Sequence, residues 1–68
     1  MIIATGKVKQ FTSDTRTPVK FNYDPITGVT AAINNNGEVM GDYKCLNEAE
    51  ALYYWRNTRF VSIDQICA

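Results

Sequence analysis

Residues 19–33 decide the fold and read VKFNYDPITGVTAAI. Apolar and polar residues alternate strictly from Val19 to Tyr23, which is the pattern of a strand with one buried face. Pro25 then fits the fixed φ of a type I turn, and Gly28 fits the left-handed position that closes a hairpin. The end of the stretch, VTAAI, is therefore predicted to return as a second antiparallel strand.

A second hairpin is predicted directly after the first. Residues 34–37 read Asn-Asn-Asn-Gly, and both residue types tolerate the positive φ that a tight hairpin requires. A strand is expected at residues 38–45, with a bulge at Gly41. The inward residues of this strand are predicted to be Val39, Gly41, Tyr43 and Cys45.

Two further strands are predicted on either side of this region. Residues 2–11 place Ile2, Ala4 and Val8 on one alternation, and Lys7, Lys9 and Phe11 on the other. Residues 12–18 lack periodicity and are rich in turn formers, so a mobile connection is expected there. Residues 60–66 are predicted to form a short last strand. The alternation does not decide whether the first strand pairs with the second strand or with the last.

A helix of about three turns is predicted at residues 47–57. Asn47 can cap its first amides, and Glu48 and Glu50 lie at the positive end of the helix dipole. At 100° per residue, the helix is predicted to cluster Ala49, Leu52 and Trp55 on the sheet side and Glu50, Tyr54 and Asn57 on the opposite side. Trp55 is assigned to the core, and Tyr53 to a flank of the core with its hydroxyl in water.

These elements define an α+β fold in ββββαβ order. We expect an antiparallel sheet of four to five strands with one helix packed on one face. The length of 68 residues suits one hydrophobic core, so residues 1–68 are predicted to form a single small domain.

Composition and charge exclude several classes of protein. Seven basic residues balance seven acidic ones, which removes the strong basic excess typical of many nucleic-acid partners. No apolar run approaches the roughly 20 residues of a membrane helix, and no signal-peptide core is present, so we expect a cytoplasmic protein without a membrane partner. In that compartment Cys45 and Cys67 are expected to stay reduced.

No catalytic or metal-binding set is recognisable in the sequence. Histidine, the commonest general base and metal ligand, does not occur. Cys45 and Cys67 lack the companion ligands of a zinc site, and no glycine-rich loop precedes the helix. We therefore expect a protein that is not an enzyme and that needs no cofactor or metal.

The aromatic run in the helix is the strongest binding signal. Its successive rings must fan out over more than half of the helix circumference, so they cannot all be buried. Tyrosine and arginine are enriched in protein interfaces. We predict a non-catalytic protein-interaction module, such as a small inhibitor or adaptor, which binds another protein through the sheet edge or the helix, with a homodimer as a further option. The predicted partner-binding residues on the helix are Tyr53, Tyr54, Arg56 and Asn57.

The alternative function is weak binding of single-stranded nucleic acid. It would use Lys7, Lys9 and Lys20 to neutralise phosphates and Phe11 to stack on a base. The run TGKVKQF ending at Phe11 resembles the opening of cold-shock domains, small five-stranded barrels that bind single-stranded nucleic acid through surface aromatics. The resemblance covers seven residues, Gln10 stands where that family has tryptophan, and the helix at residues 47–57 has no place in such a barrel. No family is assigned on this basis.

Overall fold

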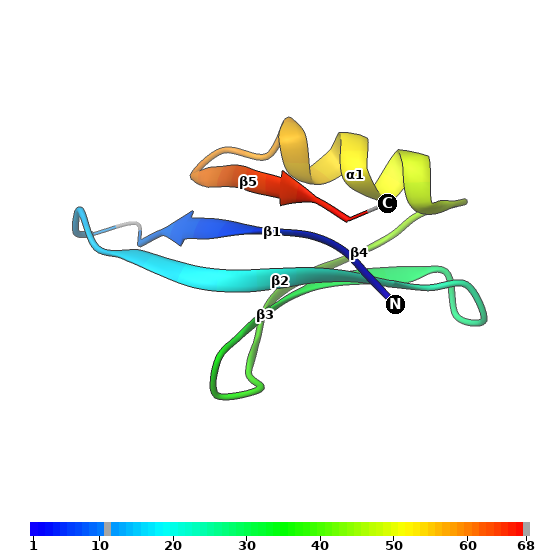
Figure 1. Ribbon diagram of the computed structural model, residues 1–68, viewed down its shortest axis with the longest axis horizontal. Coiled ribbons are helices and arrows are strands. Elements are labelled where there is room, and N and C mark those ends of the chain that lie inside the picture. Colours follow the sequence, from blue (N-terminus) through cyan, green and yellow to red (C-terminus); the bar gives the residue numbers. More distant parts are fainter. Residues whose placement is uncertain (11, 68) are drawn as a thin grey trace.

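The computed structural model describes residues 1–10 and 12–67, which form a five-stranded antiparallel sheet and one helix (Figure 1). The predicted α+β class and ββββαβ order are confirmed. The elements are β1 (Ile2–Lys9), β2 (Arg16–Asp24), β3 (Val29–Asn34), β4 (Val39–Lys44), α1 (Glu48–Arg56) and β5 (Val61–Ile66).

The sheet has the order β4-β3-β2-β1-β5, so β4 and β5 are its two edges. β1 pairs with both β2 and β5, which answers the pairing question that the sequence left open. α1 connects one edge to the other and packs on the face of the sheet near β1 and β5 (Figure 1). No described element covers the opposite face.

The core is built around Phe21 on the central strand. Its cross-strand neighbours, Ala4 and Ala32, are small and fully buried. They leave room for Trp55 from the helix, whose ring centroid lies 5.0 Å from that of Phe21. The Trp55 Nε1–H donates to the Thr30 hydroxyl at 2.8 Å, so this polar group is satisfied inside the core. The prediction that Trp55 is a core residue is confirmed.

The predicted turn and cap residues adopt the expected geometry. Gly28 and Gly37 have φ of +74° and +80° in the two hairpin turns. Asn47 caps α1 because its Oδ1 accepts a hydrogen bond from the Glu50 N–H at 2.9 Å. The Glu50 carboxylate in turn accepts from the Leu46 N–H at 3.3 Å. These paired contacts satisfy free amides at the start of the helix.

The buried face of α1 differs from the predicted one. Trp55 is buried and Leu52 packs half-buried against the core, as predicted, but the third inward residue is Ala51, and Ala49 is exposed. The predictions for the two tyrosines are also wrong. Tyr53, which was assigned to a flank of the core, is 70% exposed, and Tyr54, which was assigned to the exposed side, is half-buried. The reason is that Ala51 lets the helix approach the sheet closely while Trp55 fills the space one turn later, and this pair sets the face.

β2 begins at Arg16, three residues earlier than predicted. Its register places Pro18 opposite Lys7 and Arg16 opposite Lys9, so residues 16–18 are strand and not a mobile connection. Proline is tolerated here because the pairing of β2 with β3 ends at Val19, which leaves Pro18 with a neighbour on one side only.

The inward residues of β1 and β4 also differ from prediction. A bulge between Ile2 and Ala4 makes Ile3, rather than Ile2, the buried isoleucine. In β4, Val39 and Tyr43 are exposed because α1 packs over β1 and β5 and leaves this edge largely uncovered. The expected irregularity near Gly41 and the burial of Cys45 are confirmed.

Candidate functional site

The helix residues predicted to bind a partner lie on two different surfaces. Tyr53, Arg56 and Asn57 are exposed and follow the spacing i, i+3, i+4, so they form one solvent-facing stripe. The Asn57 side-chain amide donates to the Tyr53 carbonyl at 2.8 Å, which holds the end of the stripe in place. Tyr54 is not part of this stripe.

Tyr54 faces β4 and joins an aromatic stack. Its ring lies parallel to that of Tyr43, with centroids 4.1 Å apart and an interplanar angle of 6°. Its other neighbour is Trp55, which it meets edge-on at 4.9 Å. Tyr54 therefore connects the core to the exposed edge strand, a role that the predicted helix phase did not give it.

The backbone of β4 is paired on one side only. Cys45 N–H donates to the Gly28 carbonyl at 2.7 Å, and antiparallel pairing alternates hydrogen-bonded with non-hydrogen-bonded positions. Asp42 and Lys44, which stand opposite Ala31 and Val29, therefore turn their N–H and C=O groups away from β3. Ala31 N–H accordingly donates to the Asn22 side chain instead, at 3.0 Å.

Three of the exposed side chains of β4 are large and apolar, and they lie beside the charged Asp42 and Lys44. Val39 is 58% exposed, Met40 41% and Tyr43 50%. We call the residues Val39–Lys44, with their outward backbone groups, the β4 edge. A free edge is a template for another strand, and natural sheets commonly blunt such edges with proline, bulges or charges. β4 has one register shift, between Val39 and Gly41, so the regularly paired stretch from Gly41 to Lys44 is the part that can accept a strand.

A groove of about 230 Å³ lies between β4 and α1, and its lining is mainly apolar but includes Lys9, Asp42 and Arg59. Gly41 forms part of its wall, and Trp55 Cη2 lies 3.8 Å from the position that a Cβ on Gly41 would take, an ordinary van der Waals distance. Met40, Tyr54 and Phe60 also line the groove, from three different segments. We call this cavity the β4 groove.

The hairpin of β1 and β2 carries the basic residues of the alternative site. Lys9 stands directly opposite Arg16, and residues two apart in a strand share a face, so Lys7 and Lys20 join them on the face away from α1. Lys7 Nζ lies 2.7 Å from Asp64 Oδ2, and Lys9 Nζ lies 3.5 Å from Asp14 Oδ1. Arg16 and Lys20 form no ion pair with any described residue.

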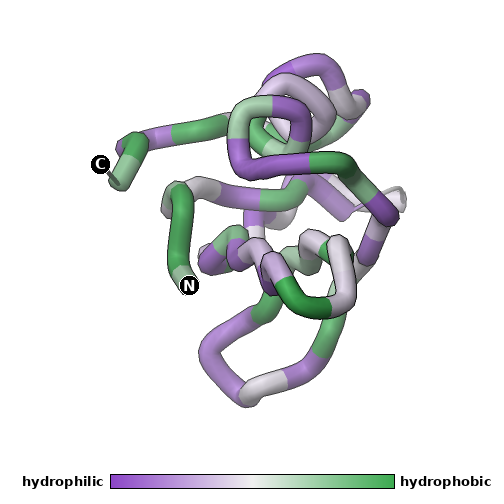
Figure 2. Tube along the Cα trace, turned by 90° about the vertical axis from the view of Figure 1, so that its right-hand side faces the viewer, coloured by the Kyte–Doolittle hydropathy of each residue, from purple (hydrophilic) through white to green (hydrophobic). Residues whose placement is uncertain are grey.

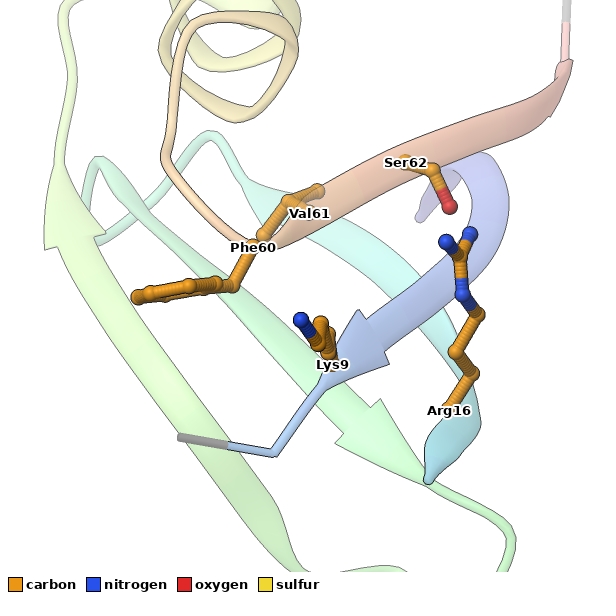
Figure 3. A pocket seen from close by; sticks show the side chains of 5 residues that line it. All are labelled: Lys9, Arg16, Phe60, Val61 and Ser62. Carbon is orange, nitrogen blue, oxygen red and sulfur yellow. The ribbon is translucent and has the colours of Figure 1, made fainter. Parts of the chain in front are cut away.

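Arg16 is the residue that sequence reasoning missed, because it was assigned to the connection. Figure 3 shows its guanidinium extending toward Ser62 of β5, beside a cavity of about 250 Å³ that Lys9 also lines. The signal that could have found it is the alternation of Arg16, Pro18 and Lys20, which continues the pattern of residues 19–23. The predicted stacking residue, Phe11, lies outside the described residues.

The two cysteines are free thiols in different environments. Cys45 is buried and Cys67 is exposed. Burial raises the pKa of the Cys45 thiol above its ordinary value of 9.0, and the nearby Glu50 carboxylate adds to the effect. Such a thiol is disfavoured as a nucleophile, which requires the thiolate.

Two further features were sought in the described part of the chain. Its residues form no group of three or more metal-ligating side chains placed to hold an ion. Its helix has neither the length nor the apolarity that crossing a bilayer requires.

No protein-family model, no curated protein and no solved structure matches this chain.

Proposed function

We propose that this domain is a non-catalytic protein-interaction module that accepts a polypeptide strand along the β4 edge. The observation that carries the proposal is the coincidence of outward backbone groups at Asp42 and Lys44 with the exposed side chains of Val39, Met40 and Tyr43. In strand addition, main-chain hydrogen bonds give affinity, and pockets for alternate side chains give specificity.

The β4 groove supplies the second requirement. An added strand would place every second side chain on the α1 side of the sheet, next to Tyr43 and the groove. Because Met40, Tyr54 and Phe60 line that cavity, apolar side chains at alternate positions fit it best. The stripe of Tyr53, Arg56 and Asn57 is proposed as an additional contact surface for the same partner.

The test is selection of extended peptides from a displayed library, followed by titration against two variants of one residue. Asp42→Pro removes an outward N–H that an added strand needs, and an edge strand tolerates proline at such a position. Asp42→Asn removes only the charge and serves as the matched control. The proposal expects a selected peptide to lose binding to the proline variant and to keep most of its affinity for the asparagine variant. Equal binding to wild type and Asp42→Pro would refute it.

A second candidate function is weak binding of single-stranded nucleic acid on the face of the β1–β2 hairpin. The observation that favours it is that Arg16 and Lys20 carry charges without ion-pair partners among the described residues and share a face with Lys7 and Lys9. Two of these four cations are already paired with carboxylates, so we rank this function second.

Fluorescence anisotropy with a labelled thymidine oligonucleotide tests the second function. Binding should weaken steeply as salt rises. Arg16→Ala should lower the affinity, and it should reduce the slope of log affinity against log salt concentration by about one unit, the amount expected for one lost phosphate contact. Arg56→Ala, on the helix, is the control with the same charge change. Absence of binding at low salt, or equal effects of the two substitutions, would exclude this function.

A further inference from the structure

We infer that the strand accepted at the β4 edge is β4 of a second copy of this chain, running antiparallel about a two-fold axis at Tyr43. The inference rests on the proposed function because it uses the same edge, and it adds the identity of the partner. In this dimer, the two sheets become continuous and both α1 helices lie on the same face.

The charges of the edge select the register. Asp42 and Lys44 are the residues whose backbone groups face outward, so an added strand must pair with them. A two-fold axis at Asp42 would set that residue opposite its own copy, and an axis at Lys44 would do the same with lysine. Only an axis at Tyr43 sets Asp42 opposite Lys44 of the second copy, twice per dimer, so the edge is self-complementary in one register.

The side chains on the other face agree with this register. Tyr43 points to the α1 side, where it stacks on Tyr54, and half of its surface is exposed. An axis at Tyr43 brings the two copies of this ring together at a non-hydrogen-bonded pair, where cross-strand side chains approach most closely. The aromatic stack of each copy then continues into the other, which covers surface that the single chain leaves in water.

The shape of the molecule leaves the edge accessible. The tip of the β3–β4 hairpin lies at the end of the molecule remote from α1 in both Figure 1 and Figure 2. β4 starts at Val39, directly after this tip, and its outer side has no neighbouring strand in the sheet. A second copy can therefore reach the outward backbone groups of β4 along the sheet plane.

The strength of the dimer follows from its size. Each Asp42–Lys44 pair exchanges both of its backbone hydrogen bonds, and a strand of six residues offers few more. Such an interface falls in the class of small, transient contacts. We expect a dimer that depends on concentration and weakens as salt screens the two ion pairs.

Sedimentation velocity over about 5 to 500 μM, the range expected for a weak interface, tests the inference. Wild type should shift from monomer to dimer, and Asp42→Lys should weaken dimerisation roughly tenfold or more, because attraction becomes repulsion at both pairs. The double variant Asp42→Lys with Lys44→Asp reverses both charges and should dimerise again. Lys20→Asp, on a strand away from the edge, is the control and should leave dimerisation unchanged.

Three outcomes would overturn the inference: a wild type that stays monomeric throughout, an Asp42→Lys variant that dimerises as wild type does, or a double variant that fails to recover. Thermal unfolding of each variant serves as the control, and the exposed substitutions should leave the melting temperature nearly unchanged. If wild type is monomeric but Asp42→Pro still abolishes peptide binding, then the edge takes a foreign strand and the second-copy inference alone fails.

Discussion

The two edges of this sheet are built in opposite ways. β5 contributes half-buried Val61 and Ile63 to the core, and its Asp64 is ion-paired with Lys7 of the neighbouring strand. β4 contributes no buried residue between Val39 and Lys44 and leaves three large apolar side chains in water. β5 therefore helps to form the core, whereas the side chains of β4 are mostly exposed.

The difference follows from where the helix lies. α1 packs against β5 and β1, and its Tyr54 and Trp55 side chains extend toward β4. Burial of apolar surface is favourable both in folding and in association. The apolar side chains of β4 that α1 leaves exposed can therefore still be buried against a partner. This is the physical reason to assign the interaction to β4.

The largest effect is expected where the helix connects the core to the β4 side. Trp55→Ala should lower the free energy of unfolding by about 3 to 5 kcal/mol, because it empties the space against Phe21 and leaves Thr30 without its donor. Urea denaturation measures the loss. Trp55→Phe, which keeps a ring but not the hydrogen bond, should cost clearly less. A loss below about 1 kcal/mol for Trp55→Ala would mean that this residue does not anchor the core.

Substitutions that disturb the packing of β5 against β1 should have the next largest effect on the free energy of unfolding. A Cβ added at Gly6 would lie 2.0 Å from the Ser62 carbonyl oxygen, so Gly6→Ala forces β1 and β5 apart. We expect a cost of about 2 to 3 kcal/mol in urea denaturation. Gly37→Ala is the comparison, since a Cβ there meets no atom within 4 Å and only the φ of +80° is strained, which costs about 1 to 2 kcal/mol. Equal costs at the two glycines would contradict the tight packing of β5.

Substitutions on the β4 edge should change the free energy of unfolding only slightly. Tyr43→Ala removes a half-exposed ring and its stack on Tyr54, which we expect to cost about 0.5 to 1.5 kcal/mol in urea denaturation. The same substitution should weaken peptide binding or self-association at the β4 edge much more. If Tyr43→Ala unfolds the domain, then β4 is part of the core and the contrast between the edges is wrong.

The smallest effect concerns the thiol that follows β4. The folded-state pKa of Cys45 is raised above the unfolded value of 9.0, so its contribution to stability is fully present below that pH and is lost as pH rises above it. Urea denaturation at rising pH should show a decline that Cys45→Ala removes. In thiol labelling, Cys67 should react first and Cys45 only on opening of the fold. Equal labelling rates would show that Cys45 is accessible.

Most of the fold could be predicted because its signals are local. The alternation in residues 19–23, the two turn glycines and the Asn47 cap each specify backbone geometry within a few residues, and the structure confirms them. Such signals need no knowledge of the neighbouring strands.

The errors arose where packing between elements decides. The helix phase depends on the Ala51–Trp55 pair fitting between Phe21 and the flanking alanines, which no helical wheel shows. The exposure of β4 depends on which strands the helix covers. Strand status for residues 16–18 depends on pairing with β1, since proline and polar residues there suggested a loop.

The predicted helix surface was partly misplaced for the same reason. Three of its residues are exposed together, whereas Tyr54 turns toward β4 and marks the edge that we now propose as the site.

The most direct test of the central claim is amide hydrogen exchange at Asp42 and Lys44, resolved by NMR. In dilute protein these outward amides should exchange fast, while the amide of Tyr43, which faces β3, should be protected. Raising the protein concentration, or adding a selected peptide, should slow exchange at Asp42 and Lys44 and leave Tyr43 nearly unchanged. If neither treatment protects the two outward amides, the β4 edge does not accept a strand and the account is wrong.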